Sequence, residues 1–230
     1  MDQNVIDAIK SSPLFRNIDD KSLGIMLDCL KPRMKKYKQR EIIVSYGQPF
    51  TGIGIIAGGR VALTKEQYSG NRIIMGFLDS GNIFGEMIAF SDRKVWPVTV
   101  ISQEDSTVLY LPPDRITTTC SNVCASHTTL ILNMLGILSN RALMLNSKIE
   151  HISAKSIRGK ISSYLLDLMH DSKGNTISIP MKRHELADYL NIPRPSLSRE
   201  LGLMRDEGII NFEGSIITIN SAVKLEESML

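Results

Sequence analysis

Two arginines and two serines lie close together near the C-terminal end of the chain, in the stretch "RPSLSRE". They are Arg194, Ser196, Ser198 and Arg199. A guanidinium group can donate two parallel hydrogen bonds to a guanine edge or pair with a phosphate, and a serine hydroxyl both donates and accepts. The stretch contains no nucleophile, base and orienting group arranged for catalysis. These residue types therefore predict recognition of a polar partner.

The same stretch carries the signals of a short amphipathic helix. Asn191 suits the left-handed end of one helix and Pro193 cannot continue it, so the next helix should begin near Arg194. Pro195 fits its first turn, where a backbone amide has no helical partner. Ser196, Arg199 and Leu203 then fall near one stripe. The residues that should face the domain core are Leu197, Leu201 and Met204.

The surrounding segments predict a winged helix-turn-helix. Apolar-faced helices are expected in "SIRGKISSYLLDLMH" and "KRHELADYL", a strand in "NTISIP" and a hairpin in "GIINFEGSIITI" around Glu213 and Gly214. In this motif, the N-terminal part of the second helix faces base edges in the major groove of DNA. The candidate readers of bases are Arg194, Pro195, Ser196, Ser198 and Arg199.

Charge supports this prediction only locally. The segment from Ser153 to Leu230 has 10 basic and 10 acidic residues, whereas Lys155 to Arg205 has 9 basic and 5 acidic ones. The alternative is that Arg194 and Arg199 are solvated and form weak ion pairs with Glu200 or Asp206.

Apolar residues before this domain repeat with a heptad pattern. Their spacings alternate between four and three over three heptads, which is typical of a coiled-coil seam. The seam residues are Ile131, Leu135, Leu138, Ala142, Leu145, Ile149 and Ile152. We predict a parallel homodimer seam. The alternative is a helix lying across a β-domain, a role that the neighbouring Leu132, Met134, Leu143 and Met144 can also serve.

The first half of the chain has an all-β pattern. From Glu41 to Leu111, the runs "EIIVSY", "GIGIIAGG", "RVALTKE", "RIIMGFL" and "TVLYL" alternate with glycine-containing turns, which predicts a sandwich or barrel. A cupin-like catalytic barrel is a rival interpretation, but it needs histidine and carboxylate metal ligands, and Met1 to Leu111 contains no histidine. The basic run "KPRMKKYKQR" before these strands is expected to be a solvated face. It could instead contact DNA flanks or RNA polymerase.

Composition excludes several classes of protein. Hydrophobic residues make up 43% of the 230 residues, and no uninterrupted apolar run approaches the roughly 20 residues of a membrane helix. The start "MDQNVIDAIKSSPLF" does not resemble a signal peptide, so we expect a cytoplasmic protein. Cys29, Cys120 and Cys124 are too few for a disulfide framework and lack the further ligands of a tetrahedral metal site. We therefore expect no metal.

Three stretches resemble the CRP/FNR family of bacterial transcription factors, named after the cyclic AMP receptor protein and the fumarate-nitrate reductase regulator. They are "SGNIFGEMIAF", "SKIEHISAKSIRGKISSYLLDL" and "RHELADYLNIPRPSLSRELGLMRDEGII". The resemblance implies an α+β protein with an N-terminal β jelly roll that is cyclic-nucleotide-binding-like, a long dimerisation helix and a C-terminal winged helix-turn-helix. We expect these parts at residues 1–124, 125–153 and 154–230.

The resemblance also assigns roles to residues of the recognition helix. The family's base-reading positions fall on Arg194, Pro195, Ser198 and Arg199. Many members have a glutamate where this sequence has Pro195. A proline cannot accept a hydrogen bond from cytosine, so the target half-site should differ at one base pair.

In the jelly roll, "FGEMIAFSDRKVWPVTV" is similar to the family's phosphate-binding cassette. There, a glutamate after a glycine holds the ribose and an arginine–serine pair meets the phosphate. Gly85 and Glu86 match, but Trp96 and Pro97 stand at the positions of that pair. A phosphate buried there would lack its counter-ion.

The family's adenine-contacting positions show the same departure, since they fall on Leu145 and Asn146. Cyclic AMP is therefore not the effector that we expect. A pocket walled by Met87, Trp96 and Leu145 suggests an unidentified, less charged small molecule. Two alternatives stay open: Trp96 fills the barrel and no effector exists, or a cyclic nucleotide binds through a non-standard phosphate seat near Arg93 and Lys94.

The sequence as a whole predicts a non-enzymatic, homodimeric, sequence-specific DNA-binding transcription regulator. Its operator should be palindromic, because a two-fold dimer requires matching half-sites. RNA polymerase is a possible further partner. A hinge is expected near Ile152 to Ser156. Effector binding would shift this hinge and change the orientation of the two recognition helices.

Overall fold

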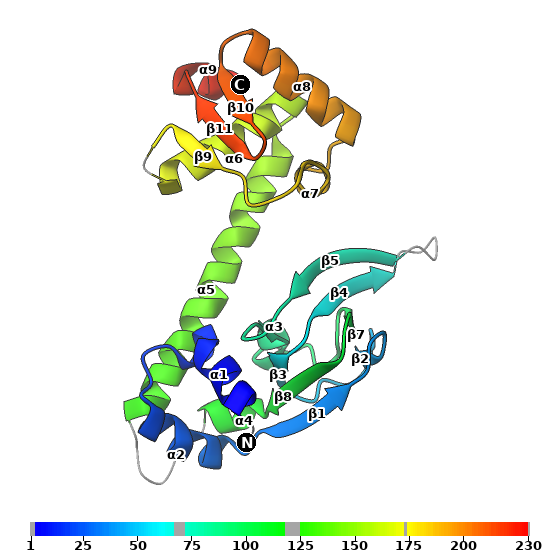
Figure 1. The fold of residues 1–230 in the computed structure, drawn as a ribbon, viewed down its shortest axis with the longest axis vertical. Helices are drawn as coiled ribbons and strands as arrows, with labels where there is room; N and C mark the ends of the chain where they lie inside the picture. Colours follow the sequence, from blue (N-terminus) through cyan, green and yellow to red (C-terminus); the bar gives the residue numbers. More distant parts are fainter. Residues whose placement is uncertain (1–2, 67–71, 118–124, 173, 230) are drawn as a thin grey trace. The chain divides into compact units, whose positions relative to one another are not determined.

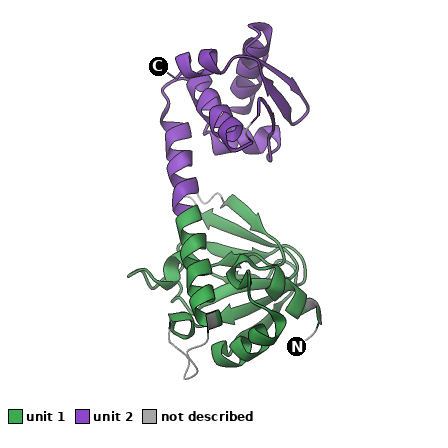
Figure 2. Ribbon diagram, turned by 90° about the vertical axis from the view of Figure 1, so that its left-hand side faces the viewer, with its two compact units in different colours: residues 1–140 green, residues 141–230 purple. Residues whose placement is uncertain are grey.

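A computed structural model describes residues 3–66, 72–117, 125–172 and 174–229 (Figure 1). The chain divides into two compact units between Asn140 and Arg141 (Figure 2). This boundary falls inside the long helix α5 (Ala125–Ser153), so each unit contains part of that helix. The expected three-part division stays a prediction. Cys120 and Cys124 lie outside the described residues.

The first unit is built on two four-stranded antiparallel sheets. Their strand orders are β1-β8-β3-β6 and β2-β7-β4-β5, which is a jelly-roll arrangement. The strands are β1 (Arg33–Tyr37), β2 (Ile42–Val44), β3 (Ile53–Gly58), β4 (Val61–Glu66), β5 (Arg72–Leu78), β6 (Ile83–Phe84), β7 (Thr99–Ser102) and β8 (Ser106–Leu111). The helices are α1 (Gln3–Ser11), the 3-10 helix η1 (Pro13–Phe15), α2 (Asp20–Leu30), α3 (Glu86–Ala89) and α4 (Pro113–Thr117). The predicted jelly roll is confirmed.

Two apolar clusters fill this unit. One lies between the helices and the β3/β8 face and includes Ile9, Leu14, Met26, Ile55 and Leu109. The other fills the space between the sheets. In the second cluster, β3 passes so close to the Phe84 ring that a side chain at Gly54 would overlap it, which explains the glycine there.

The start of α5 docks on the first cluster. Leu130 and Met134 are buried one turn apart, with Ile137 packed against the same cluster one turn later. The Asn133 amide donates hydrogen bonds to the carbonyl oxygens of Leu14 and Arg16, at 3.0 and 2.8 Å. This part of α5 therefore belongs to the β unit.

The second unit is a winged helix. Its sheet has the order β10-β11-β9. After α5 come α6 (Ile157–Ser172), β9 (Thr176–Ser178), α7 (Arg183–Tyr189), α8 (Arg194–Asp206), β10 (Ile210–Glu213), β11 (Ile216–Ile219) and α9 (Ala222–Glu227). One buried cluster joins all of them. The predicted helices, strand and hairpin are confirmed.

Candidate functional site

Helix α8 has one buried and one exposed face. Leu197, Leu201 and Met204 are buried in the core of the winged helix, as the spacing of apolar residues predicts. The other face carries the predicted base readers: Arg194, Pro195, Ser198 and Arg199 are exposed, and Ser196 is half-buried. Leu203, one turn after Arg199, is also exposed.

The connection before α8 forms as its sequence predicts. Asn191 adopts the left-handed conformation with φ 52° at the end of α7. The Ile192 amide then donates to the Ala187 carbonyl oxygen at 2.9 Å, closing the tight turn. Pro193 caps α8 with φ −57°, and Pro195 lies in the first turn. The proline-containing connection thus determines where α8 begins, and with it the positions of the exposed Arg194 and Arg199.

Arg158 of α6 holds α8 in place. Its Nε donates to Glu200 Oε1 at 2.6 Å, and its Nη1 and Nη2 donate to the two carboxylate oxygens of Glu207, at 2.6 and 2.8 Å. These hydrogen bonds lower the pKa of Glu207 and raise that of Arg158. The hydrogen bond to Glu200 holds the middle of the recognition helix, and the bidentate pair with Glu207 holds its end.

The remaining arginines of α8 differ in their surroundings. Arg205 donates to Asp206 Oδ1 at 2.9 Å and lies over the Phe212 ring. By contrast, neither Arg194 nor Arg199 has an ion pair or hydrogen bond with any other described residue. The alternative in which they pair with Glu200 or Asp206 is therefore not the observed arrangement. Both guanidinium groups are available to a partner.

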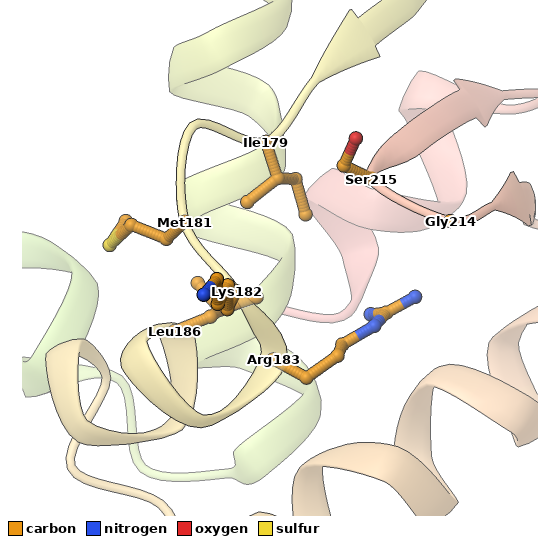
Figure 3. Close-up of a pocket in the computed structure, with 7 residues that line it drawn as sticks. All are labelled: Ile179, Met181, Lys182, Arg183, Leu186, Gly214 and Ser215. Atoms are coloured by element: carbon orange, nitrogen blue, oxygen red, sulfur yellow. The ribbon is translucent and has the colours of Figure 1, made fainter.

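A pocket of about 320 Å³ lies between the start of α7 and the turn of the β10–β11 hairpin. Its lining consists of Ile179, Met181, Lys182, Arg183, Leu186, Gly214 and Ser215 (Figure 3). Figure 3 shows Arg183 extending from α7 on the side where Gly214 and Ser215 lie. The pocket thus brings a cation of the helix-turn-helix next to the wing.

Arg183 has an unusual environment for a cation. Its guanidinium lies 4.8 Å from the centre of the Phe212 ring, and its buried Nη1 has no hydrogen-bond partner among the described residues. Burial lowers the pKa of Arg183, yet an arginine stays charged. Sequence reasoning did not single out this residue. The cluster Lys182, Arg183 and His184 at the predicted helix start was the available signal.

In the jelly roll, the side chain of Trp96, which belongs to the cassette-like stretch, is buried among aromatic rings. It is 1% exposed and contacts Phe50 and Phe84, with ring centres 5.1 and 5.7 Å away. Gly85, with φ 85°, caps α3, and a Cβ added to it would lie 2.7 Å from Trp96 Cη2. The indole therefore fills the room next to Gly85.

The local chemistry does not suit a phosphate. Trp96 supplies one neutral N–H donor, and this buried Nε1 has no partner among the described residues. Pro97 supplies no donor. Backbone hydrogen bonds hold the loop in place: the Phe50 amide donates to Lys94 O at 2.9 Å, and the Trp96 amide to Gln48 O at 2.9 Å. Arg93 and Lys94 of this loop are exposed, and the alternative phosphate seat near them stays a prediction.

The other predicted pocket residues are less enclosed. Glu86 is buried in the first turn of α3, whereas Met87 is 53% exposed. Leu145 and Asn146 are exposed on the part of α5 that belongs to the second unit. The effector pocket formed by these residues stays a prediction. Among the described residues, no group of three or more histidine, cysteine or acidic side chains is placed to hold a metal ion.

Much of α5 exposes apolar side chains. The exposed ones are Leu132, Leu135, Leu143, Met144, Leu145 and Ile149, with Leu143 at 64%. By length and composition, the stretch Ser126–Ser153 is apolar enough to cross a membrane, although it contains no long uninterrupted apolar run. Of its most apolar 18 residues, 11% are buried. Of the residues beside the predicted seam, Met134 packs on the β unit, while Leu132 does not.

Two known domain families match this chain, and they match it in the order of the two units. The family "Cyclic nucleotide-binding domain" matches residues 34–122, and "Crp-like helix-turn-helix domain" matches residues 159–228. The chain belongs to the CRP/FNR family. As a member of the CRP/FNR family with this helix-turn-helix, it is a DNA-binding transcription regulator.

Relatives of the CRP/FNR family match the whole length. The Cyclic AMP receptor protein of Thermus thermophilus is 24% identical over 220 residues, which are 95% of this chain and 97% of the relative. The structure of the Thermus thermophilus Catabolite Activator Protein has a TM-score of 0.55 at 22% identity, covering 95% of this chain and 98% of that one. A mutant of CooA from Carboxydothermus hydrogenoformans has a TM-score of 0.61 at 18% identity, covering 92% and 93%. These structures confirm the fold.

Proposed function

We propose that the protein is a homodimer that reads a palindromic operator with α8 and that it does so without cyclic AMP. The observation that carries the proposal is the pair of exposed arginines, Arg194 and Arg199. They keep their donors available while Arg158 and Arg205 are committed to carboxylates.

Within this proposal, Arg199 reads a guanine. Its position in the second turn of α8 suits a bidentate contact in the major groove, which discriminates by roughly 1–3 kcal/mol against other bases. Ser198 and Ser196 can donate to or accept from neighbouring base edges. Arg194, at the helix start, contacts a base or a phosphate. Pro195 offers only apolar contact. It has no side-chain acceptor for the amino group of a cytosine, so we expect no preference for cytosine at the base pair that it faces.

Phosphate contacts would position α8 on the DNA. Arg183 is a candidate for this role because it is a cation that lines the pocket beside the hairpin turn. Lys182 stands next to it and is exposed. Such contacts fix the orientation of the protein without reading sequence.

The exposed apolar side of α5 supports the proposed homodimer. Residues such as Leu135, Leu145 and Ile149 are exposed in the single chain, and a second copy would remove them from water. The heptad spacing of the seam suits that pairing. Two copies of α8 would then reach half-sites about 34–36 Å apart, or a multiple of that distance, on the same side of the duplex.

The jelly roll would not depend on a cyclic nucleotide. One relative is named a Cyclic AMP receptor protein, but here Trp96 and Pro97 replace the groups that would hold a phosphate. We propose either an effector that is less charged than a cyclic nucleotide or none. A transcription regulator of this kind acts in the cytoplasm, where RNA polymerase is a further partner that the exposed basic strand β1 could contact.

Selection from a random DNA pool tests this function. The purified protein, free of added ligand, should enrich a palindrome with a guanine at the same position of each half-site. Arg199→Ala should lose the preference at that guanine, whereas Arg205→Ala, which changes an arginine of the same helix that is paired with Asp206, should keep it. If the folded wild-type protein enriches no motif, or if Arg199→Ala enriches the same motif, the proposed reading is wrong.

A further inference from the structure

A buried histidine lies near the C-terminal end of α5, after a stretch of the helix with exposed apolar side chains. His151 is 3% exposed, whereas Leu145 and Ile149 in the two preceding turns are 48% and 57% exposed. His151 therefore marks the place where α5 leaves solvent and enters the winged helix. A polar ring is an uncommon choice for a buried position unless its nitrogens are hydrogen-bonded.

Both ring nitrogens have partners, and the partners come from two other helices. Nε2 lies 3.2 Å from Asp167 Oδ2 of α6, and Nδ1 lies 3.2 Å from the Tyr189 hydroxyl of α7. A carboxylate only accepts, so Nε2 carries a proton. In the neutral ring, Nδ1 then accepts from Tyr189. In the protonated ring it donates to the same hydroxyl, so the connection holds in both charge states.

Aromatic packing surrounds these hydrogen bonds. The rings of His151, Tyr164 and Tyr189 lie pairwise within 5.5 to 5.9 Å of one another, with Tyr164 edge-on to the imidazole. Lys148 Nζ, one turn earlier on α5, is 5.1 Å from the centre of the Tyr189 ring. Burial raises the pKa of Tyr164 to about 12. The cluster thus connects α5, α6 and α7 within one compact unit.

This cluster stands beside the bend between α5 and α6. Helix α5 ends at Ser153, and α6 begins at Ile157, where the Ser156 hydroxyl accepts from the Gly159 amide at 2.8 Å. The backbone between them is the expected hinge. Tyr189 belongs to the helix that precedes the tight turn into α8. A contact from His151 to Tyr189 therefore bypasses the hinge and reaches the helix-turn-helix directly.

We propose that His151 is a positioning residue that locks the last turn of α5 to the winged helix through Asp167 and Tyr189. In the dimer, this lock fixes the separation of the two copies of α8. The inference rests on the proposed homodimer that reads a palindrome. It adds a residue that determines which spacing of the two half-sites the dimer prefers.

The lock has a consequence that differs from general stabilisation. When one α8 is bound, the effective concentration of the other at its half-site depends on how rigidly the two are connected. Without the lock, each winged helix still folds around its own core and still reads a half-site. The dimer, however, loses the advantage of engaging both half-sites at one preferred spacing.

The experiment compares His151→Leu and Tyr189→Phe with the wild-type full-length protein. Dissociation constants are measured by fluorescence anisotropy on three kinds of duplex: the selected palindrome, palindromes with one base pair added or removed at the centre, and a single half-site. His170→Leu is the matched control, because His170 is an exposed histidine on α6. Tyr189→Phe removes one hydroxyl and keeps the ring packing.

We expect both variants to bind the half-site within twofold of wild type and to bind the palindrome about tenfold or more weakly, since only the connection between subunits is lost. Their preference for one spacing should weaken as well. His151→Gln should restore both properties, because its amide can donate to Asp167 while its oxygen accepts from Tyr189. The control should behave as wild type.

Three results would overturn the inference: unchanged spacing preference in both variants, equal weakening on half-site and palindrome, or no rescue by glutamine. Each would make the cluster an ordinary part of the core. Failure of the proposed function looks different, because the wild-type protein itself would then bind the palindrome no better than a half-site.

Discussion

Trp96 offers a quantitative test of how the jelly roll is filled. Replacing a buried aromatic side chain by alanine removes its contacts and leaves a cavity, at a cost of about 3–5 kcal/mol. The two ring contacts, to Phe50 and Phe84, add to the loss in Trp96→Ala. The unpaired Nε1 acts in the opposite direction, because burying a donor without a partner costs about 1–3 kcal/mol and the variant no longer bears that cost. We therefore expect a destabilisation near 3 kcal/mol.

Trp96→Phe separates the two contributions. Phenylalanine keeps an aromatic ring between Phe50 and Phe84 but has no N–H group. Because the unsatisfied donor disappears, this variant should cost less than about 1 kcal/mol despite its smaller ring. A difference of roughly 2 kcal/mol between the alanine and phenylalanine variants follows from the structure.

Urea unfolding followed by far-ultraviolet circular dichroism measures these differences. The two units need not unfold together, so the transition of the β unit must be resolved. Trp96 is the single tryptophan of the chain, and its fluorescence identifies that transition in the wild-type protein. A cost under about 1 kcal/mol for Trp96→Ala would refute the view that the indole fills the barrel. A cost well above about 1 kcal/mol for Trp96→Phe would show that Nε1 has a partner, because that variant keeps an aromatic ring and loses the N–H group.

Three further predictions concern the winged helix and α5. Hydrogen bonds from Arg158 lower the pKa of Glu207 from its ordinary 4.5, so their stabilisation is present above that pH and is lost as the pH falls through the lowered value. The urea midpoints of wild type and Glu207→Gln should accordingly differ at pH 7 and converge in acid; a constant difference would contradict this. Leu145→Glu should shift the protein from dimer to monomer in analytical ultracentrifugation while the winged helix stays folded, because it places a charge in the seam. Pro195→Glu should make DNA selection favour cytosine at one position of each half-site, and an unchanged motif would remove Pro195 from the reading face.

Local patterns account for the parts of the fold that the sequence predicted. The start of α8 depends on Asn191 and Pro193, and its buried face on the spacing of Leu197 and Leu201, all within one short stretch. By contrast, β1 lies inside the basic run, where four of its five residues are exposed and no alternation of apolar and polar residues marks a strand. Sequence reasoning therefore started the β region too late.

Contacts between distant segments account for what the sequence did not predict. Arg158 meets Glu200 and Glu207 across 42 and 49 positions of the chain. His151 reaches Tyr189 across 38 positions. Nothing in the local spacing of these residues indicates such pairs, because tertiary packing brings them together. The roles of the base readers and of the pocket residues stay predictions until DNA and effector binding are measured.

The most direct measurement is the affinity of the purified protein for its selected palindrome, with no nucleotide present and again with saturating cyclic AMP. The account predicts tight binding by two chains per duplex, with the same dissociation constant in both conditions and a large loss in Arg199→Ala. Binding that appears only after cyclic AMP is added would contradict the account, because a phosphate would then have to bind where Trp96 and Pro97 stand.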